Sequence, residues 1–260
     1  MYNNFYYKKG KKMYIEKSEI NSVIQNFTLS EIVKDNFRTA AVFEKYGLDF
    51  CCNGKRSLND ACTEKGINPA VVISEIDEIN SSLEKEEIKP DQWNPDILID
   101  YIINNHHSYV NRMLPVISAH TQKVAMVHGT NHPETKRIAE IFSAVNSEMK
   151  HHMMKEEKIL FPHIKVLQEN SSNGVSSDKP YFGTIKNPVA MMEAEHQSAG
   201  DELFEIRKLT NNYTPPADAC NTYKICFQEL KDFEEDLHKH VHLENNILFP
   251  KAIALEQSLS

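Results

Sequence analysis

One eleven-residue pattern occurs twice in the chain, and it restricts the fold more than any other feature of the sequence. Residues 152–162 and 240–250 both read His-x-x-x-Glu-x-x-Ile-Leu-Phe-Pro, and the two copies lie 88 residues apart. Self-similarity at a fixed spacing marks a duplicated structural unit. We therefore interpret the second part of the chain as two related halves.

A further histidine precedes each copy of the pattern at nearly the same distance. His107 lies 45 residues before His152, and His196 lies 44 residues before His240. Each half then consists of a helix with one core histidine, a loop, and a helix that carries His and Glu. Two such hairpins, related by a pseudo-two-fold axis, predict an all-α, up-down four-helix bundle over residues 96–256.

Apolar residues recur at alternating steps of three and four in four stretches, which predicts four amphipathic helices. Histidine and glutamate occupy positions in these apolar seams without interrupting the period, and buried ionisable groups need a chemical reason. The seams are Ile99, Ile103, His107, Val110, Leu114 and Ile117; Ile138, Phe142, Val145, Met149, His152, Glu156 and Ile159; Val189, Met192, His196, Ala199, Leu203 and Ile206; and Tyr223, Cys226, Leu230, Phe233, Leu237, His240, Glu244 and Ile247.

The ionisable seam residues are typical of a metal centre. Residues four apart share one helix face, so His152 with Glu156, and His240 with Glu244, can address one site. Buried carboxylates need compensating positive charge, and the seams contain no Lys or Arg at matching positions. Four histidines and two glutamates exceed one tetrahedral zinc ion but suit two octahedral ions bridged by carboxylates. Imidazole with carboxylate favours iron or manganese over calcium.

Two alternatives concern individual histidines. A single seam histidine is more often a hydrogen-bonded core residue than a ligand, so the metal interpretation depends on the duplication. His106 also fits a seam, through Ile99, Ile102, Tyr109 and Met113, and the half-repeat spacing slightly favours His107 as the ligand. His128, in the loop region after the first bundle helix, is a candidate to cover the mouth of the site.

The residues before the bundle predict a small helical domain with a cysteine turn. We expect a disordered extension over residues 1–19, a helical domain over 20–83 and a linker over 84–95; a long loop is expected over 169–188. Thr28-Leu-Ser-Glu31 has the pattern of a capping box for a helix that runs to about Tyr46. Gly47 would end that helix, and Ser57 would cap the next.

Cys51 and Cys52 are adjacent in the turn of this small domain. They either pack as structural thiols or form a redox-active or iron-handling pair. Lys55 and Arg56 lie nearby, and basic side chains can lower the pKa of a thiol. A disulfide between adjacent cysteines would be strained and easily reduced, which suits a switch.

Charge and hydropathy exclude several partners. The formal net charge of −8 argues against nucleic acid or an anionic membrane as a partner. The sequence has no apolar run of about 18 residues, which a transmembrane helix requires. Five cysteines in a long, helix-rich chain do not form a typical disulfide framework, so we expect a cytoplasmic protein.

The motifs carry a resemblance to a known family. The bundle resembles the haemerythrin-like domain, and residues 20–256 resemble the repair-of-iron-centres di-iron proteins of the YtfE/ScdA type. His106, which doubles the first ligand position, and the N-terminal extension depart from the family pattern. The matching segments are Leu48-Asp-Phe-Cys-Cys-Asn-Gly-Lys55, His152-Met-Met-Lys-Glu156, Glu195-His196, Asn211-Asn-Tyr-Thr-Pro-Pro216 and Leu243-Glu-Asn-Asn-Ile-Leu-Phe-Pro250.

This resemblance implies a ligand set and a function. It implies two non-haem iron ions with an oxo or hydroxo bridge, bound by His107, His152, His196 and His240 and bridged by Glu156 and Glu244. It also implies repair of iron–sulfur clusters damaged by nitrosative or oxidative stress, and we expect this to proceed by iron donation to the damaged proteins.

Two other functions fit the same coordination chemistry. One is reduction of nitric oxide at the di-iron site, so an enzymatic role stays open. The other is reversible binding and sensing of dioxygen or nitric oxide. A homodimer is also left open.

Overall fold

The computed structural model describes residues 4–8, 11–15, 23–81, 89–176 and 180–259. The chain divides into two compact units, Met1–Trp93 and Asn94–Ser260. The division falls inside the linker expected over residues 84–95, of which residues 84–88 lie outside the described part. The predicted all-α class is confirmed for the bundle and for the small helical region.

The N-terminal segment differs from the disordered extension expected over residues 1–19. Strands β1 (Asn4–Lys8) and β2 (Lys11–Ile15) pair in antiparallel register, with Asn4 opposite Ile15 and Lys8 opposite Lys11. Tyrosine and phenylalanine favour strands, and this segment is rich in them. The described part of this segment therefore has a local strand preference that the expected disorder did not include.

Among the residues of the first unit that the structure describes lie the short helices α2 (Leu29–Asp35), α3 (Ala40–Tyr46), α4 (Leu58–Glu64) and α5 (Pro69–Ser81). The capping box is confirmed, because Thr28 Oγ1 accepts a hydrogen bond from Glu31 N and Glu31 Oε2 accepts one from Thr28 N. Gly47, at φ 61°, ends α3, and Ser57 caps α4. These local signals suffice to set the element ends.

The single helix expected from Thr28 to about Tyr46 is interrupted. Asn36 adopts an extended conformation, and a 3-10 turn, η1 (Phe37–Thr39), separates α2 from α3. The Asn36 side chain accepts a hydrogen bond from Arg38 N at 3.1 Å, which starts the new turn. Asparagine commonly competes with the helix backbone in this way.

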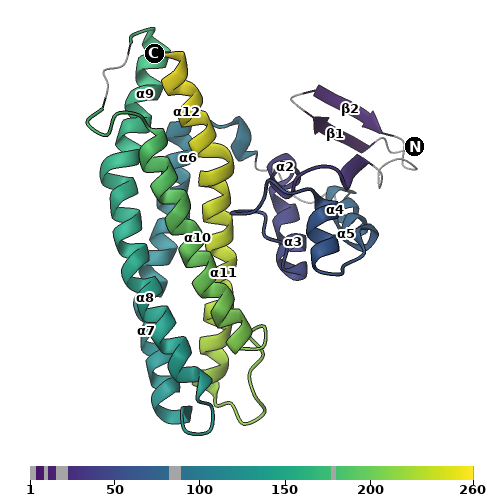
Figure 1. Cartoon of the computed structure of the whole chain (residues 1–260), viewed down its shortest axis with the longest axis vertical. Helices are drawn as coiled ribbons and strands as arrows, with labels where there is room; N and C mark the ends of the chain where they lie inside the picture. The colour runs from purple at the N-terminus through teal and green to yellow at the C-terminus, as the bar shows by residue number, and fades with distance from the viewer. Residues whose placement is uncertain (1–3, 9–10, 16–22, 82–88, 177–179, 260) are drawn as a thin grey trace. The chain divides into compact units, whose positions relative to one another are not determined.

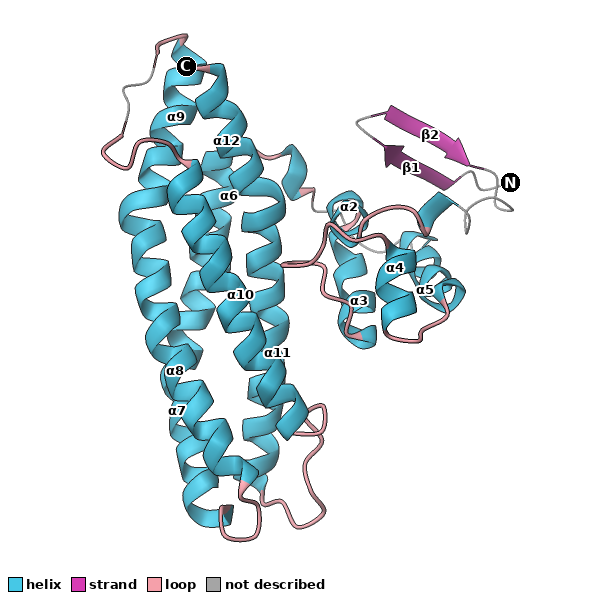
Figure 2. Ribbon diagram, viewed as in Figure 1, coloured by secondary structure: helices cyan, strands magenta, loops and turns pink. Residues whose placement is uncertain are grey.

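Four long helices form the second unit, and each runs antiparallel to the next (Figures 1 and 2). After a short turn, η2 (Pro90–Gln92), the first bundle helix comprises α6 (Pro95–Tyr101), η3 (Ile102–His107) and α7 (Ser108–His128). The second comprises α8 (Glu134–Lys155), η4 (Glu156–Leu160) and α9 (Phe161–Asn173). The third is α10 (Lys186–Leu209). The fourth comprises α11 (Asn221–Leu243), η5 (Glu244–Leu248) and α12 (Phe249–Ser258).

The core of the bundle follows the predicted seams with two exceptions. Helix α7 packs against α8 and α11, and α10 packs against α8 and α11, so each helix has two neighbours. Ile103 is only partly buried and Ile159 is 38% exposed, whereas the adjacent Ile102 and Leu160 are buried. Both exceptions lie in π-helical turns, η3 and η4, where one extra residue shifts the phase of the helix.

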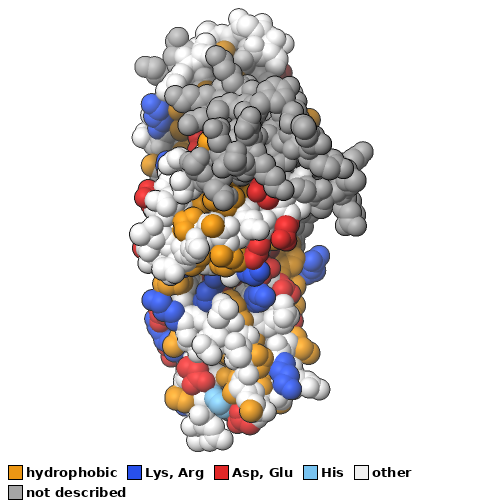
Figure 3. Space-filling view, turned by 90° about the vertical axis from the view of Figure 1, so that its right-hand side faces the viewer, with side chains coloured by type: hydrophobic (Ala, Val, Ile, Leu, Met, Phe, Trp, Pro, Cys, Tyr) orange, Lys and Arg blue, Asp and Glu red, His pale blue; other side chains and the backbone are white. Residues whose placement is uncertain are grey.

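The loop expected over residues 169–188 is shorter than predicted. Helix α9 continues to Asn173, Gly174 ends it at φ 65°, and α10 begins at Lys186. Within the described residues, none of the helices combines the length and the hydropathy that crossing a lipid bilayer requires. On the face drawn in Figure 3, basic and acidic side chains are interspersed.

Candidate metal centre

All four bundle helices contribute to one buried group of histidine and glutamate side chains. His107 ends η3, Glu156 begins η4, and Glu244 begins η5, while His152, His196 and His240 lie on α8, α10 and α11. Each of these six residues is at most 2% exposed. The structure therefore brings together the whole set of residues that the sequence predicts as ligands.

The histidines form two pairs. Nε2 of His107 lies 3.1 Å from Nε2 of His240, and Nε2 of His196 lies 2.9 Å from Nε2 of His152. Two ligand atoms about 2.1 Å from one ion and at right angles to each other would be about 3 Å apart. The spacing within each pair therefore suits neighbouring positions on one octahedral ion.

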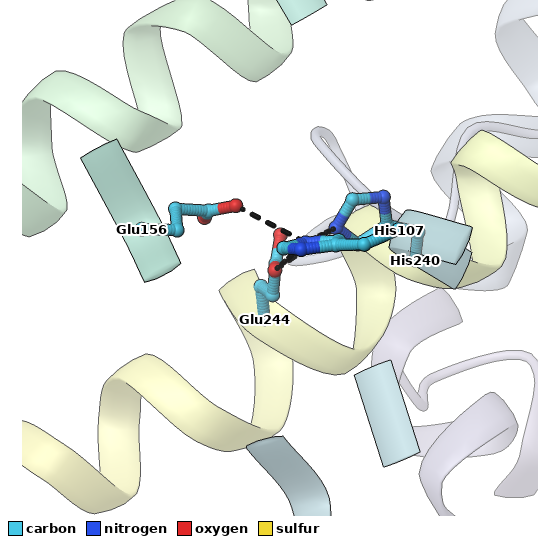
Figure 4. A group of neighbouring side chains, drawn as sticks. All are labelled: His107, Glu156, His240 and Glu244. Carbon is cyan, nitrogen blue, oxygen red and sulfur yellow. Dashed lines mark hydrogen bonds and ion pairs between the residues drawn. The ribbon is translucent and has the colours of Figure 1, made fainter. Parts of the chain in front are cut away.

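The carboxylates of Glu156 and Glu244 each lie close to both histidine pairs. Glu244 Oε1 lies 3.0 Å from Nε2 of His240, and its Oε2 lies 3.2 Å from Nε2 of His196. Glu156 Oε2 lies 3.4 Å from Nε2 of His107 and 3.3 Å from Nε2 of His152. Figure 4 shows Glu156 and Glu244 pointing toward the rings of His107 and His240. The two groups thus share their carboxylates, as bridging ligands would.

The donor set fits two cations. Both carboxylate oxygens of Glu156 are buried and accept no hydrogen bond from the described residues. Lys155, on the same turn, pairs with Glu195 instead. An uncompensated buried carboxylate is costly, and a metal ion would supply the missing positive charge.

Three of the four histidines are held through their other ring nitrogen. Nδ1 of His107 lies 2.8 Å from Glu157 Oε1, Nδ1 of His152 lies 2.9 Å from Glu195 Oε2, and Nδ1 of His196 lies 2.8 Å from Asn245 Oδ1. These acceptors fix the proton on Nδ1 and leave the Nε2 lone pair free to bind an ion. The sequence pattern did not identify Glu157, Glu195 or Asn245, although two of them directly follow the motif glutamates.

Protons occupy part of the site in the metal-free chain. Burial lowers the pKa of His107, but the nearby carboxylates of Glu156 and Glu244 outweigh burial and raise this pKa to about 10. Burial also lowers the pKa of His196, but the Glu244 carboxylate outweighs it and raises this pKa to about 9. Burial lowers the pKa of His240. Burial opposes ionisation of Glu244, but the surrounding histidines hold its pKa well below the usual value. The site therefore favours positive charge at its centre.

A π-helical turn resolves the placement of His106 and His107. Both are buried, because η3 carries them at its end and the extra residue brings both side chains inward. Only His107 faces the carboxylates. Nδ1 of His106 lies 3.0 Å from Asp236 Oδ1, and its ring is nearly parallel to that of His240, with centroids 5.8 Å apart.

His128 does not cover the site. It ends α7, 21 residues after His107 on one continuous helix, which corresponds to a rise of about 30 Å. Its Nε2 lies 3.2 Å from Cys220 Sγ, and its ring contacts Tyr223. The expected role at the mouth of the site is therefore wrong.

Cys51 and Cys52 form a separate group with Asp49. Both cysteines are free thiols, with sulfurs 3.8 Å apart. Asp49 Oδ1 lies 3.2 Å from Cys51 Sγ and accepts the backbone N–H groups of Cys51 and Cys52. The hydrogen bond with Cys52, burial and the Asp49 charge raise the pKa of Cys51 well above its usual value. The expected thiolate is thus disfavoured at Cys51, and Arg56 pairs with Glu64 instead.

Comparison with known proteins agrees with this geometry. The Hemerythrin HHE cation binding domain matches residues 98–252, so the fold and the site define a haemerythrin-type cation-binding protein. The ScdA_N domain of unknown function (DUF542) matches residues 25–80.

Relatives extend over both units. The iron-sulfur cluster repair protein YtfE of Escherichia coli O8 (strain IAI1) is 34% identical over 230 residues, which is 88% of this chain and 97% of that protein. The YtfE protein of Enterobacter sp. (strain 638) is 36% identical over 231 residues, with the same coverage. The chain therefore belongs to the YtfE family of iron–sulfur cluster repair proteins.

Proposed function

We propose that this protein holds two non-haem iron ions in its bundle and donates iron to damaged iron–sulfur clusters. His107 and His240 would bind one ion, and His152 and His196 the other. Glu156 and Glu244 would bridge them, and an oxo or hydroxo group would complete the bridge. The observation that carries this proposal is the sharing of both carboxylates between two histidine pairs.

The chain's own residues give a route for release. Imidazole binds a metal ion only when the bound nitrogen is unprotonated, so protons compete with iron for His107 and His196. The site holds no thiolate, whose tighter binding would oppose release of the ion. Relatives named for cluster repair suggest damaged iron–sulfur proteins as recipients, and we expect the protein to act in the cytoplasm.

The first test is metal identity and stoichiometry in protein purified without added metal. We expect two irons per chain, and the loss of at least one in Glu156→Ala and in Glu244→Ala. Glu229→Ala is a control that should keep both ions, because Glu229 pairs with His120 rather than with a proposed ligand. One zinc ion and no iron would refute the site assignment.

Iron transfer is tested with protein loaded with ⁵⁷Fe and an iron–sulfur protein inactivated by nitric oxide. We expect ⁵⁷Fe to enter the recipient as its activity returns. Metal-free protein, and free ferrous iron at the same concentration, are the controls. If nitrous oxide is instead produced catalytically and no label is transferred, nitric oxide reduction replaces iron donation as the function.

We also propose that Cys51 and Cys52 act in transfer or redox chemistry rather than in metal retention. Their sulfurs lie close enough to form a disulfide after a small movement, and they share Asp49 as a neighbour. Cys51→Ser with Cys52→Ser should keep the iron content and impair recipient reactivation. Cys220→Ser, which changes an exposed thiol elsewhere, should leave both unchanged. Normal reactivation by the double variant would exclude this role.

A further inference from the structure

Because the bundle is an internal repeat, the residue that holds Nδ1 of each histidine ligand in one half can be compared with the residue at the equivalent position in the other half. Glu157 directly follows the first motif glutamate, and Asn245 directly follows the second. Glu157 holds Nδ1 of His107, and Asn245 holds Nδ1 of His196, each at 2.8 Å. This pair of contacts is the same in both halves, apart from the exchange of a carboxylate for an amide.

The other pair of contacts is not the same in both halves. Glu195 precedes His196 and holds Nδ1 of His152 at 2.9 Å. The equivalent residue in the first half, which precedes His107, is His106. His106 does not take up this role toward His240: its ring is nearly parallel to that of His240, and its Nδ1 is engaged by Asp236.

His240 is consequently held less firmly than the other three histidines. Its Nδ1 is buried and has no hydrogen-bond partner among the residues that the structure describes, and Nε2 of His106 has none either. No hydrogen bond at Nδ1 therefore fixes the orientation of this ring. The absence of an acceptor also leaves the imidazole less basic than one whose Nδ1–H is held by a carboxylate.

We infer that the two metal positions are unequal and that the ion bound by His107 and His240 leaves first. This inference rests on the proposed two-ion site. The ion at His152 and His196 has both imidazoles anchored, by Glu195 and Asn245. The ion at His107 and His240 has only one anchored imidazole, His107. Loss of such an anchoring contact typically lowers metal affinity 10- to 100-fold, so we expect a similar ratio of dissociation rates.

Chelator kinetics on the wild-type protein provide the first test. Protein loaded anaerobically with ferrous iron is mixed with a chromogenic ferrous chelator, and iron release is followed by absorbance. We expect two phases of equal amplitude whose rates differ about 10- to 100-fold. Anomalous scattering at the iron edge from half-depleted crystals should show iron retained between His152 and His196.

Two reciprocal variants test the cause. His106→Glu introduces into the first half the glutamate that the second half has at the equivalent position, Glu195. This variant should slow only the fast phase of iron release. Glu195→His does the reverse, and should accelerate only the slow phase until the two phases merge. His106→Leu removes the ring without adding an acceptor and should keep both phases near the wild-type rates. A merely structural role for His106 would instead shift both phases together.

The outcomes separate this inference from the proposed function. Two bound irons released in a single phase, or iron retained between His107 and His240, would overturn the inequality and leave the two-ion site intact. Fewer than two bound ions in the wild-type protein would overturn both. Two phases with the expected response to His106→Glu would support the inequality whether or not the iron reaches an iron–sulfur protein.

Discussion

Asn245 Oδ1 accepts a hydrogen bond from Nδ1 of His196 over 2.8 Å, and this contact joins the third and fourth bundle helices at the site. An amide oxygen can only accept, so the contact fixes the imidazole proton on Nδ1. Nε2 then faces Glu244, and its lone pair can bind a metal ion once the imidazole is neutral. Replacement of Asn245 by an apolar residue should therefore weaken metal binding although no proposed ligand is changed.

Asn245→Leu keeps the number and branching of the side-chain heavy atoms but lacks the acceptor. We expect metal affinity at the His152–His196 position to fall about 10- to 100-fold, measured by competition with a chelator of known affinity. Asn246→Leu is the matched control, because Asn246 contacts His242 rather than a proposed ligand. Equal affinities for the two variants would contradict the anchoring role of Asn245.

Metal binding should release protons at neutral pH. In the metal-free protein, the pKa of His107 is about 10 and that of His196 about 9, so both imidazoles are protonated at pH 7.5. Binding requires them neutral, and about two protons should leave as the site fills. Titration calorimetry with manganese(II) in two buffers of different ionisation enthalpy measures this number. Identical heats in both buffers would refute the expectation.

The same pKa values predict the stability of the metal-free fold. Because both values are raised above the 6.5 of the unfolded chain, their contribution is fully present below pH 6.5. It is lost as the pH rises through about 9 and 10. Metal-free protein should therefore lose stability toward alkaline pH, whereas metal affinity should rise with pH.

Glu202 provides a pH dependence outside the site. Burial, with the nearby charge of Glu148, raises its pKa to about 7, and its Oε2 has no hydrogen-bond partner among the described residues. The pKa of Glu202 is 4.5 in the unfolded chain, so the folded protein keeps this proton to a higher pH. The free energy of unfolding therefore decreases as the pH rises from 4.5 to 7. Glu202→Gln should remove that loss, and its advantage over wild type in urea denaturation should be larger at pH 8 than at pH 4.5. An advantage that does not change with pH would argue against the raised pKa.

Gly54 should be essential for the cysteine turn. A Cβ atom at this position would lie 2.1 Å from the carbonyl oxygen of Phe50, a backbone atom that cannot move aside. Gly54→Ala should destabilise the first unit by about 1–3 kcal/mol, seen as an earlier thermal transition with the iron content unchanged. Gly200→Ala, within α10 and with no neighbour near the added atom, should instead stabilise the bundle by about 1 kcal/mol. A normal transition in Gly54→Ala would contradict the steric argument.

The sequence alone predicted the bundle because its evidence is local and repeated. A seam with a period of three and four identifies a helix and its buried face without knowledge of any partner helix. The duplicated motif then paired His152 with Glu156 and His240 with Glu244, since residues four apart share a face. Local hydrogen bonding also made the ends at Thr28, Gly47 and Ser57 predictable.

Only the tertiary structure decided the details that distinguish one histidine from another. A regular period cannot register the extra residue of a π-helical turn, so Ile103 and Ile159 were misplaced and His106 was not separable from His107. Contacts such as Glu195 with His152 join residues 43 apart on different helices. Helix packing sets these contacts, and no spacing along the chain specifies them. The same reason explains Cys51, whose thiol meets the carboxylate of Asp49 rather than a basic side chain, because the fold of the turn decides which charge is near.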